Sequence, residues 1–447
     1  MLTREMRRSR RVWFSLQPWK QRLLFWSGAI AVGAAAAFFA TGSELAINWF
    51  GRLIALSPWY ALLASPAGLA LTAYLTRRYF PDAQGSGIPQ TFAALHTEDR
   101  ALRHRLLSLR VAAGKVGLTL LALLSGASLG REGPTVQIGA ALMHALNRFN
   151  PDSRREFERG LILAGSAAGV AAAFNTPLAG VVFAIEEMSR SYETRTSGTV
   201  LTAVIIAGIV SIALLGNYTY FGHTSAALLQ LDDWVAVLVC GFVGGLLGGV
   251  FSRIVIAAGR GVSGRFGQFM RKRPVAFAAL GGMVLAIIGL LADGSTFGTG
   301  YLQAKSLVEG TAELPATYGV LKLLATLTSF LLGIPGGIFA PSLSIGAGLG
   351  QSLSAIVPYA PVGAVVILGM VAYFAGVIQA PITAFVIVME MTDNHAMLVP
   401  LMATALIAYG VSRLVCPQRL YEALAENFHK PHRAPATTPP VPPVSGT

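Results

Sequence analysis

An arginine and a glutamate, Arg131 and Glu132, stand side by side between two apolar runs of the chain. Residues 116–130 and residues 135–147 contain no Asp, Glu, Lys or Arg. A charged side chain inside a bilayer is costly, so it persists where it faces a cavity, a partner or an ion path. We therefore interpret this pair as functional rather than as part of a short surface loop.

Helix-breaking residues surround the pair. Gly130, Gly133 and Pro134 would interrupt a continuous helix and let a new one begin near the proline, because proline suits the first helical turn and glycine permits close backbone approach. A helix that begins inside a membrane presents unpaired N–H groups and the positive end of its dipole. The motif therefore predicts an anion site with a carboxylate beside it.

Two other stretches have the same construction, with glycines followed by a proline. They are Gly85-Ser86-Gly87-Ile88-Pro89 and Gly337-Ile338-Phe339-Ala340-Pro341. Ser86 could cap the helix that follows, which is the commonest role of serine there, or its hydroxyl could donate to an anion. Three helix N-termini could surround one partly dehydrated anion without a full positive charge, and such a site binds without trapping.

The composition is that of a polytopic membrane protein. Of the 447 residues, 54% are hydrophobic and only 12% are charged, and the mean hydropathy is +0.60. The net charge is +13, but basic residues crowd the N-terminus, which indicates a cytoplasmic N-terminus rather than nucleic-acid binding. The first apolar run, residues 23–43, is too long for the core of a signal peptide. Cys240 and Cys416 predict neither a disulfide framework nor a zinc site.

We expect an all-α membrane fold with three parts. Residues 1–22 form a basic cytoplasmic N-terminus, residues 23–428 the transmembrane domain, and residues 429–447 a Pro- and Thr-rich disordered cytoplasmic tail. The charge-free run from residue 323 to residue 389 is interrupted by prolines and glycines. It therefore predicts broken and re-entrant helices that are protected inside the protein.

An internal repeat divides the transmembrane domain. Proline, isoleucine, glycine and alanine coincide between residues 134–140 and 341–347 at a constant offset of 207. A second match, at an offset of 204, relates residues 174–186 to 378–390. Matched half-helix starts in two halves point to an ion or substrate site near the middle of the membrane. The expected halves are residues 23–215 and 233–428.

These motifs resemble the signature set of the CLC family of chloride channels and proton-coupled chloride exchangers. The resemblance rests on the three glycine-proline motifs and on a late tyrosine, Tyr421, in Arg-Leu-Tyr-Glu. It covers nearly the whole chain, roughly residues 20 to 428. It implies a homodimer with a separate anion pathway in each subunit, two halves of inverted topology, and chloride and protons as substrates with no cofactor.

The resemblance also implies roles for individual residues. The hydroxyls of Ser86 and Tyr421 and the backbone N–H groups of Ile338 and Phe339 would hold the central anion. Glu132 would be the external gate, whose carboxylate occupies an anion site until it is protonated.

The pair Glu186-Glu187 bears on the choice between exchanger and channel. Two adjacent acids at a helix end are most often solvated, but in CLC exchangers an acid at the second position, here Glu187, relays protons between the cytoplasm and the interior. Channel members tend to lack it, so we expect a chloride/proton antiporter and keep a passive CLC-type chloride channel as the alternative. Glu186 and Glu390 occupy matched positions in the two halves, which favours a structural role.

Other classes fit less well. The fluoride-exporting branch is disfavoured because Ser86 and Tyr421 follow the chloride pattern. A membrane enzyme with Glu132 and Glu187 as acid and base is disfavoured, because the sequence has no metal-ligand cluster, nucleophile elbow or nucleotide loop. Lys115, isolated in an apolar run, could offset a buried acid or approach the anion pathway. Since the tail lacks nucleotide-binding domains, we expect a multi-pass protein of the bacterial inner membrane, with both termini in the cytoplasm.

Overall fold

The computed structural model describes residues 16–150, 155–189, 194–216 and 219–429. Their secondary structure is helical, and the only β-type contacts among them are isolated bridges, Gly85 with Pro335 and Gly130 with Gly337. The prediction of an all-α fold is confirmed. Residues 1–15 of the basic N-terminus and residues 430–447 of the predicted tail lie outside the described residues.

The helices fall into two groups along the chain. The first half contains α2 (Leu16–Leu56), α3 (Ala61–Tyr79), α4 (Ile88–His96), α5 (Arg100–Leu106), α6 (Leu109–Leu124), α7 (Glu132–Ala145), α8 (Arg155–Phe174), α9 (Pro177–Phe183), the π-helix η4 (Ala184–Ser189) and α10 (Thr194–Leu215). The second half contains α11 (Val235–Arg260), α12 (Gly264–Lys272), α13 (Pro274–Leu291), α14 (Tyr301–Glu309), α15 (Tyr318–Leu331), α16 (Phe339–Ser354), α17 (Val362–Ile378), α18 (Pro381–Thr392), α19 (Leu398–Val415) and α20 (Leu420–His429). Seven helical spans among the described residues are long and apolar enough to cross a membrane, which indicates a multi-pass membrane protein.

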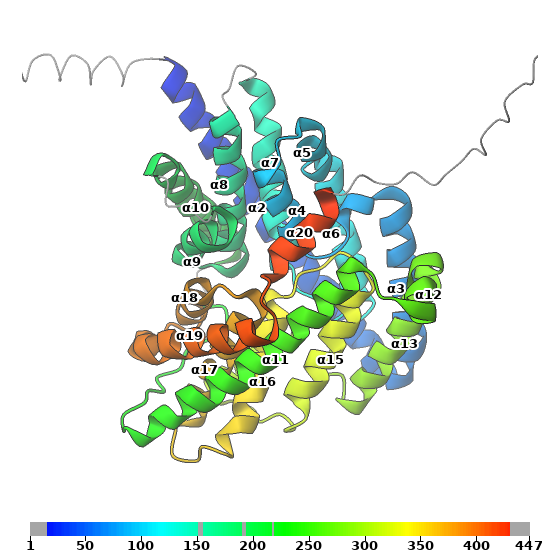
Figure 1. Ribbon diagram of the computed structural model, residues 1–447, viewed down its shortest axis with the longest axis vertical. Helices are drawn as coiled ribbons and strands as arrows, with labels where there is room; N and C mark the ends of the chain where they lie inside the picture. The colour runs from blue at the N-terminus through cyan, green and yellow to red at the C-terminus, as the bar shows by residue number, and fades with distance from the viewer. Residues whose placement is uncertain (1–15, 151–154, 190–193, 217–218, 430–447) are drawn as a thin grey trace, which may run out of the picture.

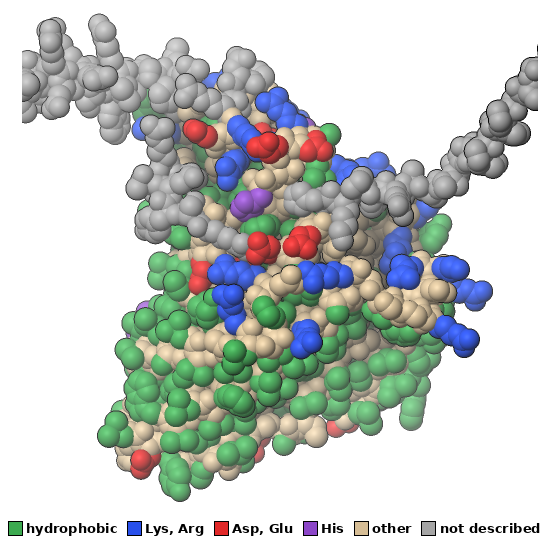
Figure 2. Space-filling model, viewed as in Figure 1, with side chains coloured by type: hydrophobic (Ala, Val, Ile, Leu, Met, Phe, Trp, Pro, Cys, Tyr) green, Lys and Arg blue, Asp and Glu red, His purple; other side chains and the backbone are tan. Residues whose placement is uncertain are grey.

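The two groups lie side by side, and helices of one group pack against helices of the other at their boundary (Figure 1). Helix α3 of the first half packs against α13 of the second, and the last helix, α20, returns to pack against α4. Figure 2 shows hydrophobic side chains over most of the lower part of this face, with Lys and Arg gathered above them and beside α12. An apolar band with basic residues on one side of it is the surface expected of a protein that lies in a membrane.

The first membrane helix is longer than predicted. The charge-free run suggested residues 23–43, whereas α2 extends from Leu16 to Leu56 without interruption. Charge-free composition underestimates the length because Glu44 and Arg52, which end the apolar run, continue the helix. The Glu44 side chain is 65% exposed, so its charge keeps contact with solvent.

The predicted interruption of the run 323–389 is confirmed. Four separate helices, α15 to α18, occupy it, and Pro335 lies between the first two. Pro341 is the third residue of α16, Pro361 precedes α17 and Pro381 begins α18. Each proline thus lies where its missing N–H costs no helical hydrogen bond.

The internal repeat has a counterpart in the backbone geometry. Asn175 and Gln379, which follow α8 and α17, both adopt left-handed conformations, with φ of 57° and 56°. The next residues, Thr176 and Ala380, have φ/ψ of −127°/83° and −126°/82°. These pairs are related by the offset of 204, so the same turn begins α9 and α18.

Glycine pairs at matched positions bring the central helices together. A Cβ atom at Gly139 on α7 would collide with the carbonyl oxygen of Gly165 on α8. A Cβ atom at Gly346 on α16 would likewise collide with the carbonyl oxygen of Gly369 on α17. Small residues of this kind allow close backbone approach between membrane helices, where packing and not hydrophobic burial drives association.

Glu186 and Glu390 each bind the N-terminus of a helix in the opposite half of the chain. The Glu186 carboxylate accepts hydrogen bonds from the N–H groups of Ile382 and Thr383 at 3.1 and 2.6 Å, at the start of α18. The Glu390 carboxylate accepts them from Leu178 and Ala179 at 3.0 and 2.7 Å, at the start of α9. Each carboxylate satisfies unpaired N–H groups and complements the helix dipole. The predicted structural role of both residues is confirmed.

Candidate functional site

The three glycine-proline motifs meet at one place in the structure. The N–H of Gly85 donates to Ile334 O at 3.1 Å, and the N–H of Gly336 donates back to Gly85 O at 3.1 Å. Gly130 and Gly337 exchange two hydrogen bonds of 2.7 Å. The starts of α4, α7 and α16 therefore converge, as the prediction of three helix N-termini around one site requires.

Glycine is needed where these motifs touch. Gly87 has a φ of +102°, and a Cβ atom there would lie 2.9 Å from the carbonyl oxygen of Gly133. A Cβ atom at Gly133 would collide with the Ser86 hydroxyl. Positive φ and close approach are the two conditions that only glycine meets without strain. The Ser86 side chain consequently lies directly against the beginning of α7.

The hydroxyls of Ser86 and Tyr421 lie close together in the interior. Ser86 is 1% exposed and Tyr421 is fully buried, with its ring centroid 6.2 Å from that of Phe339. Neither hydroxyl has a hydrogen bond of ordinary geometry in the described part of the chain. The N-cap of α4 is Gly87, with no side-chain cap, so the capping role for Ser86 is not observed. The two hydroxyls interact with each other outside ordinary hydrogen-bond geometry, so both are available as donors to a ligand.

Ile338 and Phe339 begin α16 beside these hydroxyls. Ile338 is the N-cap and Phe339 the first residue, so their N–H groups are among those that a helix leaves unpaired. The Phe339 ring stacks against Phe174 and packs edge to face against Phe183 and Phe374. The aromatic packing fixes the direction in which the first N–H groups point.

Glu132 is the first residue of α7, and its side chain is fully buried. One carboxylate oxygen accepts a hydrogen bond from the N–H of Ala340, and the other accepts one from the hydroxyl of Tyr220, both at 3.4 Å. Because Ala340 is the second residue of α16, the carboxylate lies across the N-terminus of the opposing helix. Unpaired N–H groups and the helix dipole stabilise a negative charge at that position.

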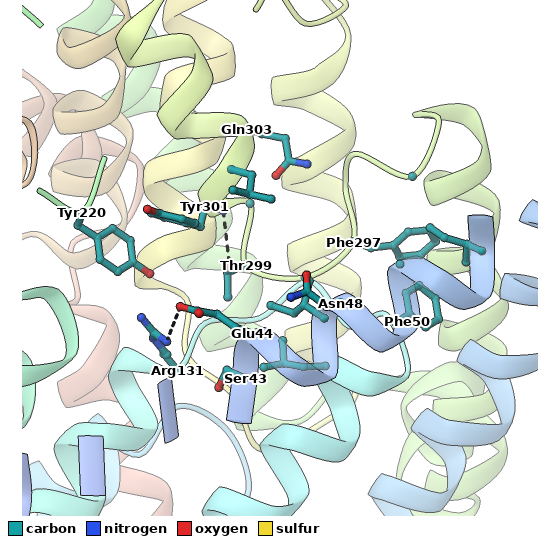
Figure 3. Close-up of a pocket in the computed structure, with 18 of the residues that line it drawn as sticks. Ser43, Glu44, Asn48, Phe50, Arg131, Tyr220, Phe297, Thr299, Tyr301 and Gln303 are labelled. Carbon is teal, nitrogen blue, oxygen red and sulfur yellow. Dashed lines mark hydrogen bonds and ion pairs between the residues drawn. The ribbon is translucent and has the colours of Figure 1, made fainter. Parts of the chain in front are cut away.

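Arg131 points from the same turn into a cavity of about 580 Å³. Its guanidinium lies 3.6 Å from the Glu44 carboxylate and over the Tyr220 ring, 5.9 Å from the ring centroid. Figure 3 shows Arg131, Glu44 and Tyr220 together at one end of the cavity, with Phe50 and Phe297 at the other. The charge of Arg131 is thus accommodated by a partner and a cavity, as the cost of a buried charge predicts.

A second cavity, of about 320 Å³, reaches Ser86. Gln84, Gly85 and Gln90 line it near the first motif, and Arg77 and Arg271 bring positive charge to its wall. One cavity therefore touches the converging motifs at Arg131, and the other touches them at Ser86. This arrangement places the candidate anion ligands between two spaces that small ions could enter.

Glu187 lies in η4, a π-helix, and is fully buried. Its neighbour Glu186 binds the start of α18, whereas Glu187 lies within electrostatic reach of Tyr421, so the two adjacent acids have separate environments. Tyr421 lies within electrostatic reach of both Glu187 and Glu132. The structure therefore brings together Ser86, Tyr421, Phe339 and Glu132, and it places Glu187 on a separate element, η4, within electrostatic reach of Tyr421.

Within the described residues, the contacts of the Lys115 ammonium are with backbone carbonyl oxygens and not with an acid. The ammonium donates to Gly85 O at 2.9 Å and lies 3.5 Å from Gln84 O, so it holds the first motif through backbone carbonyls. Gln90 does the same from α4, with its amide 2.5 Å from Gln84 O and 3.2 Å from Asp82 O. Both residues support the loop that carries Ser86.

Tyr220 and Glu44 were not predicted as parts of the site. Tyr220 follows α10 in an irregular segment and reaches Glu132 across 88 residues of sequence. Glu44 lies within a long helix and meets Arg131 only through the packing of α2. No motif surrounds either residue, although an acid within an apolar helix is a weak signal of this kind.

Comparisons with known proteins agree with this architecture. Residues 67–413 match the family model described as voltage gated chloride channel. The H(+)/Cl(-) exchange transporter ClcA of Vibrio parahaemolyticus is 31% identical over 418 residues, which cover 89% of this chain and 88% of that protein. The ClcA of Citrobacter koseri is 32% identical over 424 residues, with coverages of 89% and 87%.

Solved structures show the same fold. A slow cyanobacterial Cl⁻/H⁺ antiporter superimposes with a TM-score of 0.78 at 27% identity, over 92% of this chain and 99% of that one. A CLC-type fluoride/proton antiporter superimposes with a TM-score of 0.76 over 91% and 97%, and at 24% identity it supports the fold alone. From the family model and the full-length similarity to curated relatives, the chain belongs to the voltage-gated chloride channel family, the CLC family that its motifs resemble.

Proposed function

We propose that this protein exchanges chloride for protons across the membrane, with Glu132 as the external gate and Glu187 as the proton-transfer residue on the cytoplasmic side. The observation that carries the proposal is the position of the Glu132 carboxylate across the N-terminus of α16, where three helix starts converge. The names of the curated relatives, both proton/chloride exchange transporters, support the choice of substrates.

The chloride ligands in this proposal are partial charges. The hydroxyls of Ser86 and Tyr421 are buried and without ordinary hydrogen bonds in the described chain, so each can donate to an anion. The N–H groups of Ile338 and Phe339 add two further donors from the start of α16. Because none of these four groups carries a full positive charge, chloride would bind strongly enough to lose water and weakly enough to leave.

The gate works by competition between two anions. The ionised Glu132 carboxylate lies against N–H groups that would otherwise face chloride, so the carboxylate and a chloride ion exclude each other there. Protonation removes the charge and with it the attraction to the helix N-terminus. A protonated side chain would leave and open the path, and its return would carry the proton inward.

The cytoplasmic proton step falls to Glu187. A free proton cannot cross an apolar interior, so a titratable group must accept it and pass it toward Glu132. Glu187 is buried in η4, and Tyr421 lies within electrostatic reach of both acids. The chloride route past Ser86 and the proton route past Glu187 would therefore meet near Tyr421.

Purified protein in liposomes tests the exchange directly. An imposed chloride gradient should drive protons uphill in the opposite direction, and a proton gradient should drive chloride. Chloride movement without uphill proton movement would instead make the protein a passive CLC-type chloride channel, which shares the anion site. No chloride movement at all would remove both candidates.

The proposal includes a homodimer with an independent pathway in each subunit. Large apolar side chains are exposed on α9, α10, α18 and α19, namely Leu178, Ile205, Ile209, Ile382 and Leu406. A complete set of ligands and two cavities occur within one chain, so no residue of a second subunit is needed for the site. Linked dimers with one inactive subunit should keep about half the flux, because independent sites contribute additively.

We place the protein in the bacterial inner membrane with both termini in the cytoplasm. The curated relatives are bacterial, and basic residues gather on one side of the apolar band in Figure 2. The positive-inside rule assigns that side to the cytoplasm. Protease or thiol-labelling accessibility of each terminus in membrane vesicles would test the orientation.

A further inference from the structure

Tyr220 stands between the larger cavity and the gate. Its side chain is 3% exposed, lines the cavity of about 580 Å³ and directs its hydroxyl to the Glu132 carboxylate at 3.4 Å. Tyr220 therefore contacts both the cavity and the carboxylate. The residue belongs to no motif and comes from the irregular segment after α10.

The position of the Tyr220 ring is fixed on several sides. Phe174, Phe221 and Tyr301 pack edge to face against it, with ring centroids 5.4, 4.9 and 4.9 Å away. The Phe221 N–H donates to Met391 O at 2.9 Å, which ties the segment to the end of α18. The hydroxyl is therefore held in place by packing and not by the carboxylate that it contacts.

The hydroxyl interacts differently with the two protonation states of the gate. A phenol donates a stronger hydrogen bond to an ionised carboxylate than to a neutral acid, because the acceptor carries charge. The distance of 3.4 Å is long for an O–H···O bond, so the stabilisation is at the lower end of the range. The contact favours the ionised carboxylate in its present place.

We propose that Tyr220 is a positioning residue that latches the ionised gate and thereby sets the external pH at which transport begins. The inference rests on the proposed function of Glu132 and adds a regulating partner to it. When a proton from the cavity binds the carboxylate, the latch weakens and the neutral side chain is released. Transport then begins at a lower pH than it would without the hydroxyl.

Other groups face Glu132 and keep the expected effect moderate. Arg131 precedes it on the chain, and its charge is shared with Glu44 on α2. Ala340 donates from α16, and Tyr421 on α20 lies within electrostatic reach. These groups remain when the Tyr220 hydroxyl is removed, so the gate should still close.

The test is Tyr220→Phe, which keeps the packed ring and removes only the donor. In proteoliposomes the curve of coupled flux against external pH should move about 0.5 to 1 unit toward alkaline pH, with the proton-to-chloride ratio unchanged. Tyr301→Phe is the matched control, because it removes a hydroxyl from the same cavity and the same aromatic cluster. Its curve should coincide with that of the unmodified protein.

Equilibrium chloride binding separates this inference from the proposed function. Calorimetric titration in detergent should find about threefold tighter chloride binding in Tyr220→Phe at neutral pH, since the unlatched carboxylate competes less well. In the Glu132→Gln background the tyrosine change should have no effect on binding or flux. An unchanged pH curve together with unchanged chloride affinity, or an equal shift in Tyr301→Phe, would overturn the latch. A protein that proves to be a passive channel would fail the proposed function, and the chloride titration would still decide the latch.

Discussion

In the first half of the molecule the nine-residue helix α4 begins after a left-handed glycine, Gly87, and in the second half the nine-residue helix α14 begins after another, Gly300. A buried lysine binds backbone carbonyl oxygens in the loop before each of these helices. Lys115 binds the carbonyl oxygen of Gly85 at 2.9 Å, and Lys322 binds those of Thr296 and Gly298, both at 2.8 Å. The two lysines are separated by 207 residues, the offset that also relates Pro134 to Pro341.

The corresponding loops nevertheless open into different cavities. Ser86, which precedes Gly87, lines the cavity of about 320 Å³, whereas Thr299, which precedes Gly300, lines the cavity of about 580 Å³. Halves of inverted topology produce this result, because equivalent elements face opposite sides of the membrane. Equivalent loops of the two halves thus line the two different cavities.

The two halves differ at the positions of Glu132 and Glu187, the acids proposed to carry the proton. At the offset of 207 the partner of Glu132 is Phe339, and at the offset of 204 the partner of Glu187 is the buried Met391. Glu186 and Glu390, which bind helix ends, are retained in both halves. The comparison teaches that the acids kept in both halves bind helix ends, whereas the two acids proposed to carry the proton each occur in one half only.

The largest expected effect comes from removing the gate acid. Glu132→Gln imitates the protonated side chain, so chloride should still pass while pH dependence and uphill proton movement fall to background. The partner change, Phe339→Leu, should retain coupling even if the loss of aromatic packing changes the rate, because the side chain at this position cannot titrate. Flux of both ions in proteoliposomes measures the difference. Persistent proton pumping in Glu132→Gln would exclude this residue from the mechanism.

Proton transfer should depend on one member of the Glu186-Glu187 pair. Glu187→Gln keeps the size and polarity of the side chain but cannot titrate, so folding and chloride movement should remain while proton transport is lost. Glu186→Gln should keep coupling and lower the free energy of unfolding by about 1 kcal/mol, since the neutral amide interacts less with the N-terminus of α18.

Ion fluxes and thermal unfolding of the two variants distinguish these roles. The reverse pattern, with coupling lost only in Glu186→Gln, would show that the proton uses the other acid. Loss of proton transport in both variants would contradict the separation of structural and proton-carrying acids that the two halves suggest.

Much of the fold could be predicted because its signals are local. The three glycine-proline motifs predicted the helix starts at α4, α7 and α16, and the repeat predicted matched positions for Glu186 and Glu390. Proline and glycine restrict the backbone wherever they occur, so their effect is visible without tertiary information. The extent of α2 was underestimated because Glu44, which ends the charge-free run, lines a cavity that the sequence does not reveal.

The contacts around the gate could not be predicted, because they join distant segments. Tyr220 and Glu132 are 88 residues apart, and Ala340 and Glu132 are 208 apart. Lys115 was equally ambiguous, since its partners are backbone carbonyls, which every residue possesses. Side chains that bind backbone groups leave no complementary residue type in the sequence, so only the packing of the halves identifies them.

The two buried lysines should both support stability but differ in their effect on chloride. Lys322→Met removes the donor to the carbonyl oxygens of Thr296 and Gly298, which should lower the free energy of unfolding by about 2 kcal/mol. Lys115→Met should lower it by less, about 1 kcal/mol, because Gly85 O keeps the N–H of Gly336 and Gln84 O keeps the amide of Gln90. Lys115→Met should also weaken chloride binding, because Gly85 adjoins Ser86, whereas Lys322→Met should not. Thermal unfolding and chloride titration of the same preparations measure the two effects. Equal loss of affinity in both variants would mean that the lysines act through general destabilisation.

The smallest expected effect compares the hydroxyls of Ser86 and Thr299. Thr299 Oγ1 accepts the first N–H of α14, from Tyr301, at 3.3 Å, whereas the Ser86 hydroxyl has no such bond in the described chain. Thr299→Ala should therefore lower stability by about 0.5 to 1 kcal/mol and leave chloride binding unchanged. Ser86→Ala should do the opposite, with stability retained and chloride binding about fivefold weaker, the effect of one lost hydrogen bond. The two residues occupy equivalent turns. Equal chloride affinities in both variants would therefore mean that the hydroxyl is purely structural in both halves. Chloride would then be bound by Tyr421 and the N-terminus of α16 without Ser86.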